Sequence, residues 1–252
     1  MMLKPPISRM GGESKLRKTI ISMLLEHICY VELFFGAGWV YFGKKPAKVE
    51  VINDIDKELI NLFRMIKYHA PEVERMLQYD FSGRDMFEEY KNESIGNLTE
   101  INRAVRFLYL ITQSFASKCG NYGYGTNTKP GQQIFYAETL KNLKERLSNT
   151  YVENLSFEKI IDKYDREYTC FFADPPYFGT AGYGNDFGEK EHLLLRDKLS
   201  NIKGKFILTI NDHEKVRKWY KGFNIKEVEV NYSVSREQKA RCKYKELIIT
   251  NY

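Results

Sequence analysis

The residues Asp174-Pro175-Pro176-Tyr177 follow a short apolar run and combine groups that suit a particular chemistry. Proline has no N–H and a fixed φ, so each prolyl unit leaves a rigid backbone whose carbonyl oxygen can accept a hydrogen bond. Asp174 adds a second acceptor, and Tyr177 offers a flat ring on which a planar group can stack. Two acceptors beside a stacking ring suit the exocyclic amino group of a nucleobase. The apolar run predicts a buried strand, and open α/β folds bind ligands where such strands end.

A glycine-containing turn follows an earlier apolar run, residues 28–35, and an acid, Asp54, follows the next one. Gly36 and Gly38 would let the backbone approach a ligand closely, and Asp54 could hold a pair of ribose hydroxyls. The pyrophosphate fingerprint G-x-G-x-x-G is incomplete because position 41 is tyrosine. This departure argues against NAD and leaves room for a nucleoside ligand without a pyrophosphate. Glycines that serve only a tight turn, and Asp54 as a helix cap, are the alternative interpretations.

Strand-like and helix-like patterns alternate at both ends of the chain, whereas helical patterns dominate its middle. We expect strands at residues 28–35, 49–53, 151–155, 169–173 and 205–210, with a closing strand pair at 223–230 and 245–250. We expect helices at residues 15–27, 56–68, 72–77, 101–115, 138–147, 191–199 and 214–220. Asn53 or Asp54 is expected to cap the second of these helices. The sequence therefore predicts an α/β sheet split by a largely helical insertion.

The composition bounds the class of protein. The chain has 252 residues, of which 43% are hydrophobic and 29% charged, as in an ordinary soluble domain. The net charge of +6 and the pI near 8.9 are compatible with a polyanionic partner. Four scattered cysteines indicate neither a zinc site nor a disulfide framework. We expect a protein of a reducing cytoplasm, without a signal peptide, a membrane segment or a metal.

Three segments, taken in order, resemble a known family: Glu32-Leu33-Phe34-Phe35-Gly36-Ala37-Gly38, Asn53-Asp54-Ile55-Asp56 and Asp174-Pro175-Pro176-Tyr177. Their combination is similar to the Dam-type (D12 class) adenine-N6 DNA methyltransferases of the alpha group, and the resemblance runs from Pro5 to the C-terminus. It implies a Rossmann-like methyltransferase sheet with helices on both faces, interrupted by a mostly helical DNA-recognition insertion. Residues 1–56 and 150–252 would form the catalytic domain that binds S-adenosylmethionine, and residues 57–149 the insertion.

The resemblance implies a set of residues that bind S-adenosylmethionine. This set is Arg9, Gly11, Gly12, Glu32, Phe34, Gly36, Gly38, Asp54, Phe157 and Asp174. Asp54 would take the ribose hydroxyls, and Phe157 would contact the cofactor's ring, although Ser156 stands where the family usually has an acid. The N-terminal segment departs further, with Arg9 for an aromatic residue and Glu13 for a lysine. This glutamate reverses the charge expected beside the cofactor.

The implied reaction is an in-line transfer of a methyl group from a sulfonium to N6 of adenine. Asp174, Pro175, Pro176 and Tyr177 are the implied catalytic residues. The Asp174 carboxylate and the Pro175 carbonyl would accept the two N–H groups of the amine and stabilise the charge that develops on it. Tyr177 would stack on an adenine that has been flipped out of the duplex.

The resemblance also indicates where duplex DNA would bind. The glycine-rich run that begins at Lys118 loosely resembles the family's hairpin, and a second basic run lies between the last two expected strands. The residues expected to contact DNA are Lys118, Asn121, Tyr122, Lys129, Arg236, Lys239 and Arg241. Solvated surface loops with incidental lysines are the alternative interpretation. Asn211 and Asp212 are candidates for lining the target pocket, and His213 for a position at a helix start.

Two other functions remain open from the sequence. Related aminomethyltransferases act on cytosine N4, on RNA bases or on protein glutamine, and Asp174 together with the large insertion favours DNA adenine. A methyltransferase-like module that binds DNA without turnover is the second alternative, because Glu13 replaces a lysine. For the assembly, we expect a monomer or a weak dimer in the cytoplasm of a bacterium or a phage-infected cell. The recognition sequence does not follow from these residues.

Overall fold

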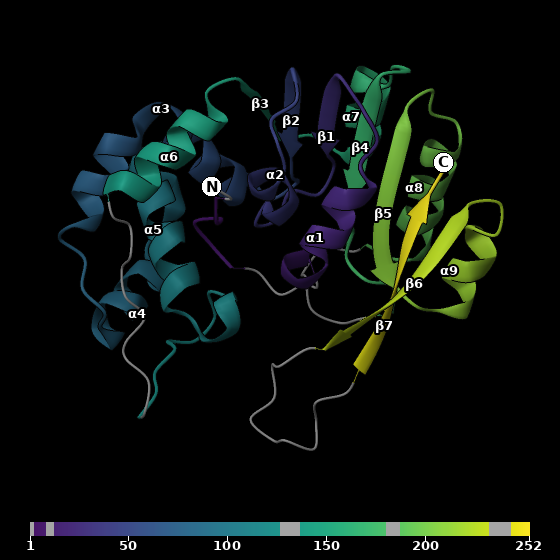
Figure 1. The fold of residues 1–252 in the computed structure, drawn as a ribbon. Helices are drawn as coiled ribbons and strands as arrows, with labels where there is room; N and C mark the ends of the chain where they lie inside the picture. The colour runs from purple at the N-terminus through teal and green to yellow at the C-terminus, as the bar shows by residue number, and fades with distance from the viewer. Residues whose placement is uncertain (1–2, 9–12, 127–136, 180–186, 232–242) are drawn as a thin grey trace. The chain divides into compact units, whose positions relative to one another are not determined.

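The computed structural model describes residues 3–8, 13–126, 137–179, 187–231 and 243–252 (Figure 1). The chain divides into two compact units, which are described separately. One, called the helical unit here, comprises Met1–Gly11, Gly36–Gly43 and Asp56–Asn154. The other, called the sheet unit, comprises Gly12–Phe35, Lys44–Ile55 and Leu155–Tyr252.

Seven strands form one sheet in the order β3-β2-β1-β4-β5-β7-β6. Their bounds are β1 Cys29–Glu32, β2 Val49–Asn53, β3 Thr150–Glu153, β4 Thr169–Ala173, β5 Lys205–Asn211, β6 Asn224–Asn231 and β7 Lys243–Thr250. The pairs β1–β2, β1–β4 and β4–β5 are parallel, whereas β7 runs antiparallel to both β5 and β6. The predicted Rossmann-like α/β sheet and its closing strand pair are confirmed.

The pleat of the sheet separates two sets of side chains in the sheet unit. On one face, Val31, Phe171 and Leu208 join a buried core with residues of the helices α7 (Phe157–Tyr164), α8 (Glu189–Ser200) and α9 (Glu214–Trp219). Figure 1 shows α1 (Glu13–Met23) on the other face, in front of the sheet. All five residues of β4 are buried, as expected for a parallel strand that is covered on both faces.

The helical unit contains the remaining helices. Their bounds are α2 Trp39–Gly43, α3 Lys57–Leu77, α4 Arg84–Asn92, η1 Ile95–Asn97, α5 Glu100–Gln113, η2 Phe115–Ser117 and α6 Ala137–Leu147. The side chain of Thr99 caps α5 by accepting from the backbone N–H of Asn102. Helix α3 is broken at His69, where φ is −130°, two residues before Pro71. Proline removes one helical hydrogen bond and clashes with the preceding turn, so the two expected helices form one broken element.

Three details of the elements differ from the expectations. The cap of α3 is Asp56, whose carboxylate accepts from the backbone N–H groups of Glu58 and Leu59, so the prediction of Asn53 or Asp54 as the cap was wrong. Helices α4 and α7, of nine and eight residues, were not predicted. Strand β1 is shorter than expected, because the chain turns after Glu32. Since Asp54 does not cap α3, the helix-cap interpretation of this acid falls away.

Candidate functional site

The turn that follows β4 is held at its first residue by the neighbouring strand. Ala173 of β4 pairs with Leu208 of β5, so the residues that come next, Asp174 and Thr209, lie side by side. The Thr209 hydroxyl donates to Oδ1 of Asp174 at 2.6 Å. Thr209 is only 1% exposed, whereas Asp174 is half-buried. A buried hydroxyl therefore fixes one side of a carboxylate that reaches the surface.

The far end of the same turn is tied to the end of β5. The Asn211 amide donates to the Phe178 carbonyl at 2.9 Å, and its oxygen accepts from the Phe178 N–H at 2.9 Å. Asp212 forms a two-pronged ion pair with Arg217. The prediction that both residues line a target pocket stays a prediction; the structure shows that Asn211 holds the backbone of the turn. The expected position of His213 at a helix start is confirmed, since its side chain caps α9.

Aromatic side chains pack around Phe178, the residue that directly follows the turn. The Phe178 ring meets His192, His213 and Trp219 edge-on, at centroid distances of 5.6, 4.9 and 5.0 Å. His192 is 1% exposed and bonds the backbone of Pro176, which can only accept because proline has no N–H. Within the described part of the chain, its Nε2 has no hydrogen-bond partner. The neutral ring thus donates to the second proline of the turn, and burial lowers its pKa to about 4.

We expect this buried histidine to make the fold acid-sensitive. An unfolded chain takes up a proton on His192 near pH 6.5, whereas the folded chain does so only near pH 4, so stability falls as the pH drops through this window. The full difference corresponds to about 3 kcal/mol. Urea unfolding between pH 7 and 4 should show this loss for the wild type and not for His192→Phe. Equal pH curves for wild type and His192→Phe would contradict the assignment.

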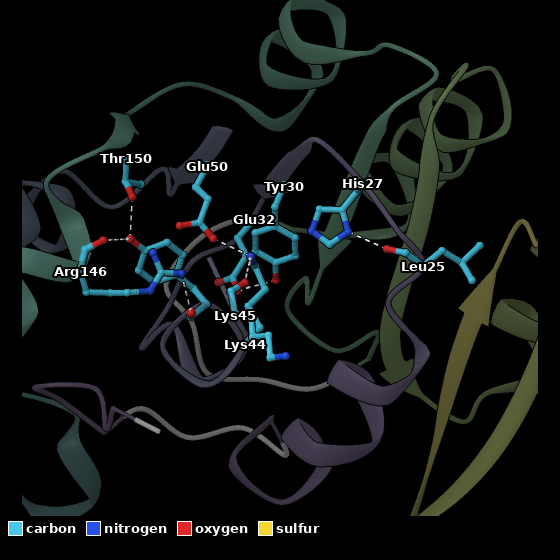
Figure 2. A network of polar contacts seen from close by, with 10 residues as sticks. Leu25, His27, Tyr30, Glu32, Lys44, Lys45, Glu50, Arg146 and Thr150 are labelled. Atoms are coloured by element: carbon cyan, nitrogen blue, oxygen red, sulfur yellow. Dashed lines mark hydrogen bonds and ion pairs between the residues drawn. The ribbon is translucent and has the colours of Figure 1, made fainter. Parts of the chain in front are cut away.

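Glu32 ends β1 on the same face of the sheet as Thr209 and belongs to a buried polar network (Figure 2). The Tyr30 hydroxyl donates to its Oε1 at 2.7 Å, and Glu32 is 1% exposed. The Lys44 ammonium lies 4.0 Å from the centre of the Tyr30 ring and 2.5 Å from Oε1 of Glu50. Strand register explains the cluster, because Tyr30 of β1 pairs with Glu50 of β2. The buried Lys44 ammonium therefore contacts both the Glu50 carboxylate and the Tyr30 ring, whose hydroxyl orients Glu32.

Asn53 joins three chain segments at the carboxyl ends of the strands. Its amide donates to the carbonyls of Leu33 and Leu155, at 2.9 and 3.0 Å, and its oxygen accepts from the Leu155 N–H at 2.9 Å. These bonds hold the segment after β1 beside the segment before α7, where the rings of Phe34 and Phe157 lie 5.7 Å apart. Phe187 meets both rings within 5.8 Å. The predicted cofactor residues Phe34 and Phe157 are thus brought together.

The glycine turn continues directly from this segment. Gly36 and Gly38 have φ values of +50° and +74°, a backbone conformation that favours glycine. A Cβ at Gly36 would meet no atom of the described residues within 4 Å, so among these residues open space adjoins the backbone there. Tyr41, which interrupts the pyrophosphate fingerprint, is fully buried in the helical unit and its hydroxyl bonds Thr150 at 2.6 Å. Tyr41 therefore has a packing role in the core of the helical unit.

The loop of residues 114–126 in the helical unit has an unusual backbone. Ala116, Ser117 and Cys119 all have φ near +55°, which is strained for residues other than glycine. Bonds across the loop, such as Phe115 N–H to the Asn121 carbonyl at 2.8 Å, hold it together. A Cβ at Gly123 would lie 3.1 Å from backbone atoms, so a side chain there would crowd the loop.

The exposed side chains of the 114–126 loop fit a polyanionic aromatic partner. Lys118 and Asn121 are exposed, as are the rings of Phe115 and Tyr124. The Arg84 guanidinium lies 5.2 Å from the ring centre of Tyr124 and 5.4 Å from that of Tyr122. Tyr122 itself is half-buried, packs on Phe87 and bonds the Ser82 hydroxyl at 2.9 Å. Tyr122 thus supports the loop from inside in this structure.

Several predicted residues fall outside the described part of the chain: Arg9, Gly11, Gly12, Lys129, Arg236, Lys239 and Arg241. Among the described residues, no group of three or more His, Cys, Asp or Glu side chains is placed to hold a metal ion. No described helix is long and apolar enough to cross a bilayer. Burial raises the pKa of the Cys170 thiol to about 12, which suits a small core residue and not a nucleophile.

Sequence reasoning missed Thr209 and His192, which touch the turn, and Arg84, which faces the exposed loop. Thr209 lies 35 residues beyond Asp174, and only the strand register joins them. Period-two alternation places Thr209 on the face of the sheet opposite α7–α9, next to the end of β4, and this was the one signal available. His192 and Arg84 carry no such signal.

Comparison with known proteins shows the family to which the chain belongs. The profile described as D12 class N6 adenine-specific DNA methyltransferase matches residues 10–234. The chain belongs to this family, whose members methylate N6 of adenine in DNA.

Two curated relatives cover most of this chain. The type II methyltransferase M1.LlaDCHI of Lactococcus lactis subsp. cremoris is 28% identical, over 99% of this chain and 96% of the relative. The DNA adenine methylase of Haemophilus influenzae is 25% identical, over 87% of this chain and 83% of the relative. Among solved structures, the precorrin 8W decarboxylase of Methanobacterium thermoautotrophicum matches with a TM-score of 0.46 at 9% identity, over the full length of both chains. That likeness is too remote to bear on the function.

Proposed function

We propose that the turn Asp174–Tyr177 is where this chain carries out the reaction of its family, with S-adenosylmethionine as the methyl donor. The single observation that carries the proposal is the Asp174 carboxylate, fixed by the buried Thr209 hydroxyl at the end of β4 and followed by two prolyl carbonyls. No other described strand end combines a fixed carboxylate with such a backbone.

The amine of adenine is a poor nucleophile because its lone pair is delocalised into the ring. The Asp174 carboxylate and the Pro175 carbonyl accept its two N–H bonds, which favours a pyramidal nitrogen with its lone pair directed outward. The negative carboxylate also stabilises the positive charge that develops at N6. Tyr177 stacks on the flipped adenine and holds it in line with the methyl group. Pro176 fixes the backbone between these groups.

The residues at the carboxyl ends of β1 and β2 fit a nucleoside-type cofactor. S-Adenosylmethionine, when bound, supplies the methyl group from its sulfonium. The open space beside Gly36 admits a ligand close to the backbone, and the clustered rings of Phe34 and Phe157 suit its base. Asp54, which is half-buried and does not cap α3, would take the ribose hydroxyls. Glu32 is a buried carboxylate already oriented by Tyr30, and it suits an ammonium group.

The helical unit supplies the surface that would read duplex DNA. Lys118 and Asn121 on the exposed 114–126 loop suit phosphates and base edges, while Arg84 and Tyr124 add a cation beside an exposed ring. Lys129, Arg236, Lys239 and Arg241 remain part of this proposed interface. The domain roles follow: residues 57–149 read the sequence, and residues 1–56 and 150–252 bind the cofactor and react. We expect a cytoplasmic monomer or weak dimer that requires no metal.

The decisive experiment gives activity, target base and recognition sequence together. The chain is expressed in a host that lacks adenine methylation, and modified bases are mapped by sequencing the host DNA. We expect N6-methyladenine within one short sequence motif. Parallel transfer assays with labelled S-adenosylmethionine should label duplex DNA and leave ribosomal RNA and a protein extract unlabelled. Label only in RNA or protein would refute the substrate, and cofactor binding without transfer to DNA would favour the module that binds without turnover.

A further inference from the structure

A buried hydroxyl on the strand next to the reactive turn has no assigned role in the reaction. Thr209 lies near the end of β5, and its side chain is on the face of the sheet opposite the core under α7–α9. Its exposed fraction is 1%, so bulk water does not compete for its hydrogen bond. Its only proton has two acceptors in reach, Oδ1 of Asp174 at 2.6 Å and the Ala173 carbonyl at 3.4 Å. The short bond to the carboxylate is the stronger of the two.

This bond acts on the orientation of the carboxylate. A carboxylate offers about four lone-pair positions on two oxygens, and its rotation about the terminal torsion is soft. A donor fixed to a β-strand occupies one lone pair from the buried side and sets the plane of the group. Asp174 itself is half-buried, so its carboxylate reaches a surface at which a substrate amine can arrive. The hydrogen bonds that His192 and Asn211 make to the backbone of Pro176 and Phe178 hold the turn but do not involve this carboxylate.

We propose that Thr209 is a positioning residue for the methyl transfer, which holds the Asp174 carboxylate in the plane that accepts the amine of the flipped adenine. The proposal rests on the proposed role of Asp174. It adds that the hydroxyl acts on the chemical step and leaves the binding of cofactor and DNA to other residues.

The test compares Thr209→Val with Thr209→Ser and with a matched control. Valine keeps the shape and removes the donor, whereas serine keeps the donor. Thr169→Val is the control, because Thr169 is also 1% exposed, lies on β4 and donates to a backbone carbonyl, that of Tyr164, at 2.8 Å. Thr169→Val thus removes a similarly buried hydroxyl at the start of β4, at the end of that strand away from Asp174.

Single-turnover methylation of duplex DNA is measured at saturating S-adenosylmethionine, together with KM for DNA and the Kd of the cofactor. For Thr209→Val we expect a rate about 10- to 100-fold lower, as for a lost hydrogen bond to a charged group, with KM and Kd within about twofold. Thr209→Ser should recover most of the rate, and Thr169→Val should keep it.

Two results would overturn the proposal while leaving the function intact: a normal rate for Thr209→Val, or an equal loss of rate in Thr169→Val. If the wild type itself leaves adenine unmodified, the proposed function fails and the role of Thr209 falls with it. The wild-type arm therefore separates the two failures.

Discussion

Replacing Asp174 with alanine should lower the rate of adenine methylation by about 10²- to 10³-fold, the range found when a preorganised partner of a developing charge is removed. The variant loses the acceptor that Thr209 holds at the end of β4. The Pro175 carbonyl remains, so the amine keeps one of its two acceptors and a residual rate survives. The measurement is single-turnover transfer to duplex DNA at saturating S-adenosylmethionine, which separates the chemical step from binding.

Asp162→Ala is the matched control for this experiment. Asp162 lies on α7, is exposed and pairs with Lys198 at the surface, so its removal should leave the rate unchanged. Asp174→Asn adds a second comparison, since an amide oxygen can still accept from Thr209 while the negative charge is lost. A normal rate for Asp174→Ala would show that the chemistry lies elsewhere in the chain.

Replacing Lys44 with methionine should destabilise the fold by about 3–5 kcal/mol, the cost of leaving a buried charge without its partner. The side chains of Lys44 and Glu50 are 2% and 4% exposed, and the ammonium also faces the Tyr30 ring. The loss would be a large part of the total stability of a domain, which is about 5–15 kcal/mol. Urea unfolding at pH 7 gives the free energy directly, provided the transition is two-state.

Lys45→Met controls for the loss of a lysine, because Lys45 is exposed beside Lys44 and should change the free energy by no more than about 0.5 kcal/mol. The double variant Lys44→Met with Glu50→Leu should recover most of the stability, since it removes both charges together. A loss below about 1 kcal/mol in Lys44→Met would contradict the prediction.

Local sequence signals were sufficient for the sheet and for the two turns that carry polar groups. The apolar run before Asp174 and the glycines after β1 are contiguous signals, and both stand at strand ends as expected. Contacts set by register were not predictable, because the bond from Thr209 to Asp174 depends on how β4 and β5 align. The left-handed backbone at Ala116 and Ser117 was not predictable either, since neither residue favours it.

Helix capping shows the same limit on a smaller scale. Asp54 and Asp56 are both acids ahead of α3, and either suits an N-cap by residue type. The choice is made by where β2 ends, and an uncertainty of two residues at that boundary exchanges their roles. Asp56 is the cap in the structure, so the cap interpretation does not apply to Asp54.

The alternation of side chains across the sheet places residues of the apolar core on one face and residues of the polar groups on the other. Val31, Phe171 and Leu208 point to the face under α7–α9, while Tyr30, Glu32 and Thr209 point to the opposite face. Substitutions that repack the first face leave the polar groups of the second in register, because the backbone pairing is shared but the side chains are not. The strands can therefore change in sequence on one face while the polar groups of the other face keep their positions.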